Sequence, residues 1–153
     1  MSTDIGLERL LKDHRFFRDM PPEACAVIAG CAINERFNAG DYIIRQGEAA
    51  DKFYLIRHGA VAQELHVPDR EPIIVQTLHE GDILGWSWLV PPYQWTMDSR
   101  AMQLTRVLSL DARCLRSKYE NDPTLAYELF KRFVPVLADR LEAARLQLID
   151  IYG

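Results

Sequence analysis

The side chains best suited to metal binding or catalysis are few in this sequence and are poorly spaced for either task. The histidines are His14, His58, His66 and His79. None of them forms the H-x-H pair with which a cupin-type β-barrel holds its metal. No G-x-S-x-G, P-loop or H-E-x-x-H motif is present. We therefore expect no metal site, no catalytic residues and no enzymatic activity.

The cysteines are odd in number and show no paired motif. They are Cys25, Cys31 and Cys114, and no two of them have C-x-x-C spacing. This usage predicts reduced, mostly buried thiols in a cytoplasmic protein.

Composition limits the partners of the chain. Its 153 residues are enough for one domain with a core, and its net charge is -4. Phosphate contacts dominate DNA affinity and need clustered Lys and Arg, so we expect no direct nucleic-acid binding. Apolar runs fall short of the roughly 20 residues of a membrane span, and the first residues do not form a signal peptide. The sequence therefore predicts a soluble protein with no membrane segment.

Helical and strand patterns alternate along the chain. Residues 4–13 have helical spacing, and Pro21 and Pro22 open a second predicted helix that runs through Ile33. Short apolar runs punctuated by glycine then predict strands: YIIR, FYLIR, AVAQELHV, PIIVQTL, DILGWSWL and TRVLSL. His58-Gly59 between the second and third runs predicts a type I′ hairpin. The class is mainly β with flanking helices, as in a sandwich, barrel or jelly roll.

The C-terminal segment returns to helical periodicity after Leu110. Asp111 and Asp122 are predicted N-caps, and Pro135 predicts a kink or break. An a/d seam of heptads follows: Phe130, Val134, Leu137, Leu141, Ala144, Leu148 and Ile151. Its Phe130 end is expected to pack on the chain's own strands, whereas residues 141–151 should extend beyond a small domain. We therefore predict a parallel homodimer through Val134, Leu137, Leu141, Ala144, Leu148 and Ile151.

Two segments together carry a family resemblance. GDYIIRQGEAADKFYLIRHGAV and LHEGDILGWSWL resemble the cyclic-nucleotide-binding domain family, which includes the Crp/Fnr regulators, kinase regulatory subunits and gated channels. The resemblance implies a double-stranded β-helix, a jelly-roll-like β-roll, with N-terminal helices and a long C-terminal dimerisation helix. It implies one domain over residues 1–153, with N-terminal helices in 1–34, the roll in 35–110 and C-terminal helices in 111–153.

The resemblance also implies a phosphate-binding cassette over residues 85–101. Backbone N–H groups at a helix start and one guanidinium hold the phosphate in such a site. Arg100, before Ala101, matches the phosphate arginine, whereas Trp86 stands where the family has a ribose-binding glutamate. The implied ligand-binding residues are Gly85, Trp86, Ser87, Trp88, Leu89, Ser99, Arg100, Ala101 and Arg145.

The aromatic character of the cassette leaves three outcomes open. The pocket binds a cyclic nucleotide, cAMP or cGMP, through stacking and Arg100; it binds another anionic or aromatic ligand; or its own tryptophans fill it. Haem is a further alternative, although no histidine, cysteine or methionine is well placed as an axial ligand. No helix-turn-helix follows the last helix within the sequence. We expect a ligand-sensing regulatory homodimer that signals to a partner protein, or a structural interaction module.

Overall fold

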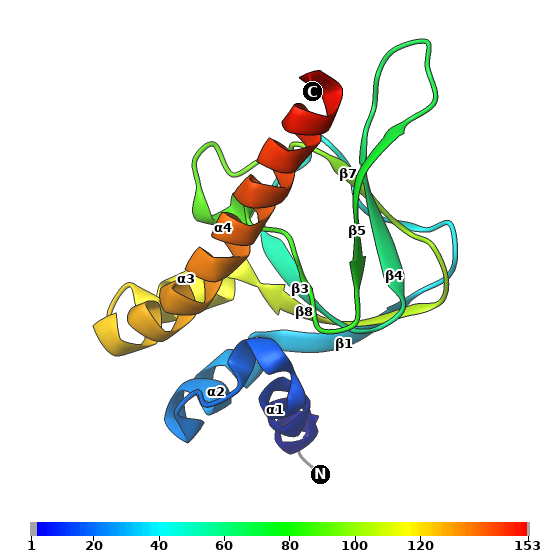
Figure 1. Cartoon of the computed structure of the whole chain (residues 1–153). Helices are drawn as coiled ribbons and strands as arrows, with labels where there is room; N and C mark the ends of the chain where they lie inside the picture. Colours follow the sequence, from blue (N-terminus) through cyan, green and yellow to red (C-terminus); the bar gives the residue numbers. More distant parts are fainter. Residues whose placement is uncertain (1–2, 153) are drawn as a thin grey trace.

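The computed structural model describes residues 3–152, with side chains from residue 6 to residue 150 (Figure 1). The helices are α1 (Thr3–Asp13), α2 (Pro22–Ala29), α3 (Ala112–Tyr119) and α4 (Pro123–Tyr152), with 3-10 turns η1 (Arg15–Phe17) and η2 (Ser87–Leu89). The strands are β1 (Ala32–Phe37), β2 (Tyr42–Ile44), β3 (Lys52–His58), β4 (Ala60–Leu65), β5 (Ile73–His79), β6 (Ile83–Leu84), β7 (Asp98–Ala101) and β8 (Thr105–Asp111).

The strands form two antiparallel four-stranded sheets. Their orders are β1-β8-β3-β6 and β2-β7-β4-β5. Figure 1 shows the N-terminal helices at one end of this roll and α4 passing along its side. The predicted fold, a jelly-roll-like β-roll with flanking helices and a long C-terminal helix, is confirmed.

All six predicted apolar runs contain strands, but the start of the roll differs from the prediction. Helix α2 ends at Ala29, and β1 occupies the segment in which the helix was expected to finish. Strand β1 pairs with β8 from Ala32 opposite Leu110 to Phe37 opposite Thr105. Cross-strand pairing of this length outweighs the weak helical preference of a few residues.

The connection at Gly59 is not a hairpin, so that prediction is wrong. Strands β3 and β4 belong to different sheets, and β4 pairs with β5 and β7. Gly59 has a φ of +112°, and a Cβ there would lie 2.5 Å from the Thr105 hydroxyl oxygen. The glycine is therefore needed for a close crossing between the sheets.

Strand β3 is buried on both faces and divides the core in two. Phe53 and Leu55 face the helices, while Tyr54 and Ile56 face the interior of the roll. This follows from the alternation of side chains along a strand. Burial raises the pKa of Tyr54 far above its ordinary value, so this hydroxyl stays protonated.

The two C-terminal helices begin at their predicted caps. The Asp111 carboxylate accepts from the backbone N–H groups of Arg113 and Cys114, and the Asp122 carboxylate accepts from that of Leu125. Helix α4 then runs for 30 residues with Pro135 inside it, so of the expected kink or break the break is wrong. Pro135 is exposed, and water can therefore solvate the carbonyl that loses its intrahelical partner.

Helix α4 lies along the roll over most of its length. Phe133 is in the core, Arg140 donates from Nη2 to the carbonyl oxygen of Ile83, and Gln147 donates from Nε2 to that of Val75 at 2.6 Å. These three side chains are seven residues apart and therefore share one helix face. The expectation that residues 141–151 extend beyond the domain is thus wrong up to at least Gln147, because the helix crosses the roll lengthwise.

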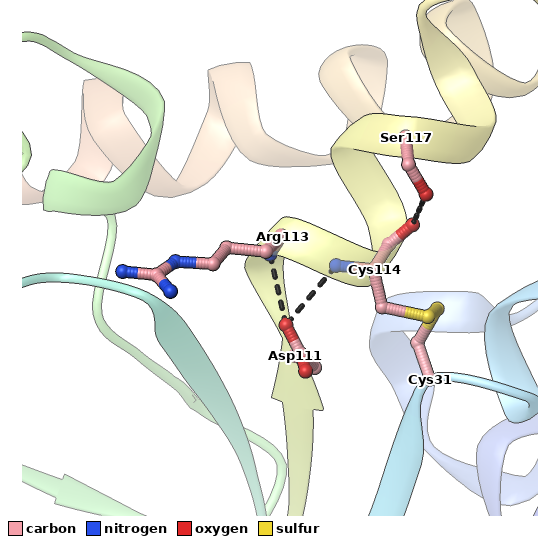
Figure 2. The surroundings of a disulfide bond; sticks show 5 residues. All are labelled: Cys31, Asp111, Arg113, Cys114 and Ser117. Atoms are coloured by element: carbon pink, nitrogen blue, oxygen red, sulfur yellow. Dashed lines mark hydrogen bonds between the residues drawn. A yellow bond between two sulfur atoms is a disulfide. The ribbon is translucent and has the colours of Figure 1, made fainter.

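Cys31 and Cys114 form a disulfide, which corrects the prediction of three reduced thiols. Their Cα atoms lie 5.7 Å apart because β1 starts beside the end of β8, where the Asp111 N–H donates to the Cys31 carbonyl. Figure 2 shows Cys114 in the first turn of α3, next to the Asp111 cap. Cys25 remains a buried thiol, and burial raises its pKa.

Candidate ligand site

The first half of the cassette turns into the core. Trp88 is fully buried and stacks on Phe53 with ring centroids 4.9 Å apart, and it makes a T-shaped contact with Phe133. Leu89 packs against the same cluster. Arg116 donates from Nη2 to the Trp88 carbonyl oxygen at 2.9 Å, which fixes the turn η2. Trp88 and Leu89 therefore hold the cassette in place from behind, and neither lines a cavity at its mouth.

The mouth of the cassette is almost filled. Its cavity measures about 20 Å³, which is room for roughly one water molecule. It is lined by Ile44, Gln63, Gly85, Trp86, Ser87, Trp95, Thr96, Met97 and Ser99. None of these side chains carries a charge. The cavity as it stands has neither the volume nor the cation that a cyclic phosphate needs.

Trp95 accounts for much of this filling. A Cβ on Gly85 would lie 2.7 Å from the Cη2 atom of the Trp95 ring, so the indole rests directly on the glycine backbone. Gly85 has a φ of +98°, which a larger residue adopts only with strain. Trp95 also packs against both core clusters.

Arg100 does not reach the cassette cavity. Strand alternation places Ser99 on the cavity side, and Arg100 then projects from the opposite face of β7. There it contacts the Glu64 carboxylate, with 2.8 Å from Nη2 to Oε2 and 3.2 Å from Nε to the same oxygen. Glu64 is 3% exposed and Arg100 31% exposed. This interaction raises the pKa of Arg100.

The structure thus separates the residues that the sequence grouped. Gly85, Trp86, Ser87 and Ser99 line the cavity, whereas Ala101 is buried without lining it. Arg145 is exposed on α4, and its Nη1 atom lies 3.7 Å from Oε2 of Glu142.

Thr96 and Met97 were missed as lining residues, and the period-two pattern that leads to Ser99 could have indicated Met97. Gln63 was missed as well, although it lies opposite Ser99 in the sheet.

A larger groove adjoins the cassette cavity. It measures about 400 Å³, within the usual range of small-molecule sites, and lies between the roll and α4. The two cavities share Gln63, Trp86 and Met97. The groove is completed by Val75, Gln76, Leu137, Arg140, Leu141, Ala143, Ala144 and Gln147. Most of this wall is apolar, and Arg140 is its single charged side chain.

Arg140 also lines a second, more polar cleft of about 840 Å³. That cleft is bordered by charged residues of both signs from η1 and the turn after it, from the turn before β6 and from α4: Arg15, Arg18, Asp19, Asp82, Lys131, Arg132 and Asp139. Arg15 there contacts Asp82, with 2.6 Å between Nη2 and Oδ1. Burial lowers the pKa of Arg140, while the charges of Asp82 and Asp139 act in the opposite direction.

Residues 3–152 contain no cluster of three or more metal-ligating side chains of the His, Cys, Asp or Glu type. Within the same range, no helix combines the length and hydropathy that crossing a bilayer requires.

The comparisons with known proteins agree with the fold. The family model described as "Cyclic nucleotide-binding domain" matches residues 34–122, and the chain belongs to this family. Over 145 residues it is 33% identical to cGMP-dependent protein kinase, isozyme 1, of Drosophila melanogaster, covering 90% of this chain and 17% of the kinase. It is 24% identical to a CRP-like cAMP-activated global transcriptional regulator of Mycobacterium tuberculosis, covering 95% and 63% of the two chains. The chain thus spans less than two thirds of either relative.

A solved structure is similar over nearly its full length. A putative cyclic nucleotide-binding protein from Geobacter metallireducens is 26% identical with a TM-score of 0.76, covering 92% of this chain and 99% of that one. The regulatory β-roll of the cyclic-nucleotide-binding, Crp/Fnr-like type is therefore established for this chain.

Proposed function

We propose that this protein is a ligand-sensing regulatory domain, without enzymatic activity, whose ligand occupies the groove between the roll and α4 rather than the cassette. The whole chain of 153 residues acts as one domain in this proposal. It works in the cytoplasm on a partner protein. A stable disulfide is uncommon in that compartment, so the redox state of Cys31 and Cys114 in cells bears on the location.

One observation carries the proposal: the contrast between the two neighbouring cavities. The cassette cavity of about 20 Å³ has an uncharged lining, whereas the groove of about 400 Å³ contains a guanidinium and an apolar wall. A cyclic nucleotide would have to displace Trp95 from Gly85 and would then find no cation at its phosphate. Arg100 is committed to Glu64, whose carboxylate would be left buried if the arginine turned away.

Titration with cAMP and cGMP tests the closed cassette, with tryptophan fluorescence as the readout. We expect no saturable change up to about 1 mM, which corresponds to a binding free energy weaker than about -4 kcal/mol. The double variant Trp86→Glu/Trp95→Arg removes the filling rings and adds a carboxylate and a guanidinium at the cavity wall. It should gain cAMP binding, read out by calorimetry. Micromolar cAMP binding by the unmodified chain would overturn the proposal.

The output of the sensor is proposed to be a homodimer through α4. Tyr127, Val134, Leu141 and Leu148 are seven residues apart and each is more than half exposed, so they form an apolar stripe along one helix face. Of the other predicted interface residues, Leu137 and Ala144 line the groove, and the side chain of Ile151 lies outside the described residues. Leu141 belongs to both stripe and groove. Groove occupancy would therefore bear directly on the dimer contact.

Sedimentation equilibrium of two matched variants tests the dimer. Leu148→Glu places a charge on the stripe, whereas Leu146→Glu places one at an equally exposed leucine away from it. We expect the unmodified chain and Leu146→Glu to be dimers at tens of micromolar and Leu148→Glu to be a monomer. A monomeric unmodified chain at that concentration would remove the dimer from the proposal.

The filled cassette also favours a second function, a structural interaction module that binds no small ligand. The groove discriminates the two functions, because a pure interaction module would show no saturable small-molecule binding there. Ligand titrations that report on Trp86 therefore decide between them.

A further inference from the structure

Arg140 is a half-buried cation whose hydrogen-bonding capacity is only partly used. Its Nη2 donates to the Ile83 carbonyl oxygen, whereas Nη1 is buried without a hydrogen-bond partner. The ion pairs found among the described residues do not include it. A buried donor without a partner is costly, and a guanidinium stays charged in proteins. The position is therefore preset for an anion.

The groove around Arg140 constrains the rest of the ligand. Leu137, Leu141 and Ala144 of α4 form one apolar wall, and Trp86 and Met97 form the other. The uncharged amides of Gln63, Gln76 and Gln147 are the other polar side chains at the rim. Such a cavity holds an apolar body of roughly drug-fragment size and offers few partners for a sugar or a purine.

Charge balance limits the bound anion to a single negative charge. One guanidinium neutralises one negative charge, and a second charge would remain buried without a partner in an apolar groove. The planar guanidinium matches the two oxygens of a carboxylate.

From these contacts we infer that the groove binds an amphipathic monocarboxylate, with its carboxylate on the guanidinium of Arg140 and its apolar body against Trp86 and the α4 leucines. This inference rests on the proposed function, since it names the ligand class of the same groove. The anchoring charge then comes from the long helix and not from the cassette. Arg140 and Leu141 are adjacent in the chain, so the ligand would bridge the roll to the helix turn that contributes to the apolar stripe.

Calorimetry with two probes of equal shape tests the inference. The probes are 3-phenylpropanoate and its neutral amide, 3-phenylpropanamide. We expect the carboxylate to bind about ten- to a hundredfold more tightly than the amide, because the neutral amide oxygen accepts a weaker hydrogen bond from the guanidinium than a charged carboxylate does. Arg140→Gln should abolish that preference, whereas Arg145→Gln, on the exposed side of the same helix, should retain it. Equal affinity for the two probes, or a preference that survives Arg140→Gln, would overturn the inference.

A second variant pair guards against misfolding of Arg140→Gln. Ala144→Trp fills the groove while the arginine itself is retained, and Ala138→Trp adds the same ring at an exposed position that does not line it. Ala144→Trp should lose carboxylate binding and Ala138→Trp should keep it. If the Ala144→Trp and Ala138→Trp variants bind 3-phenylpropanoate with equal affinity, the groove is not the binding site. Failure of both probes to bind at about 10 mM also overturns the inference.

A failure of this inference can be distinguished from a failure of the proposed function. Binding of the amide alone, blocked by Ala144→Trp, keeps the groove as the sensing site and rejects only the anion. Micromolar cAMP binding that survives Ala144→Trp rejects the groove in favour of the cassette.

Discussion

The pairing of Arg100 with Glu64 gives the sharpest test of how the cassette has changed. Arg100→Met would leave the Glu64 carboxylate, 3% exposed, without its cation. Removing one partner of a buried pair costs about 3 kcal/mol. For a chain of this size each kcal/mol lowers the melting temperature by about 2–4 °C, so the variant should melt about 6–12 °C lower.

A double-mutant cycle isolates the pair from other effects of the substitution. Glu64→Leu alone should also destabilise, because Arg100 then loses its counter-ion. The double variant Glu64→Leu/Arg100→Met should be more stable than the sum of the single effects by at least about 1.5 kcal/mol. Urea unfolding monitored by tryptophan fluorescence gives the free energies of unfolding.

The Arg100→Met variant also tests whether Arg100 stabilises the fold or binds the ligand. If Arg100 is a structural cation, Arg100→Met loses stability and keeps the affinity for 3-phenylpropanoate. An unchanged melting temperature together with lost ligand binding would refute this reasoning and return Arg100 to the role of anion anchor.

Three further outcomes follow from individual contacts. His14 donates from Nε2 to the Ile56 carbonyl oxygen and accepts at Nδ1 from the Phe16 N–H, and burial lowers its pKa, so its neutral form is favoured. Stability should therefore be full above about pH 6.5 and fall below it by at most about 1.4 kcal/mol per pH unit, and His14→Gln should flatten that part of the urea-midpoint profile. Reducing Cys31–Cys114 should lower the free energy of unfolding by about 2–4 kcal/mol, and Cys31→Ser should unfold identically with and without reductant. Gly85→Ala should lower the free energy of unfolding in urea by about 1–3 kcal/mol more than Gly40→Ala does. Both glycines have positive φ, but only a Cβ at position 85 would meet the Trp95 indole. Equal losses of stability in the two variants would contradict the packing of Trp95 on Gly85.

Features of the fold that depend on local interactions were predicted from the sequence, whereas features that depend on contacts between distant residues were not. Glycine-punctuated apolar runs and the Asp111 and Asp122 caps are local signals, and the structure confirms them. The assignment of β3 and β4 to different sheets depends on pairing with distant strands, which a two-residue connection does not reveal. The path of α4 likewise depends on contacts of Arg140 and Gln147 with the roll.

The candidate site was predicted only in part. The resemblance pointed to residues 85–101, and Trp86 lines the small cavity there. Ser99 and Arg100 were assigned to the same ligand, although neighbours in a strand face opposite ways. The role of Arg140 depends on burial and on an unused donor, and neither is visible in a sequence. Similarly, three cysteines without a paired motif contain no information on which two of them meet.

The bond between Cys31 and Cys114 changes the topology of the covalent chain. It joins residues 83 positions apart and thereby closes the roll and its cassette into a covalent ring, from the start of β1 to the first turn of α3. Helices α1 and α2 precede this ring, and α4 leaves it as a single strand of chain. A movement of α4 is therefore transmitted to the roll through non-covalent contacts and through the short link after α3. The covalent ring formed by the disulfide stays closed during such a movement. One proteolytic cut within the ring would leave its two fragments joined until a reductant is added.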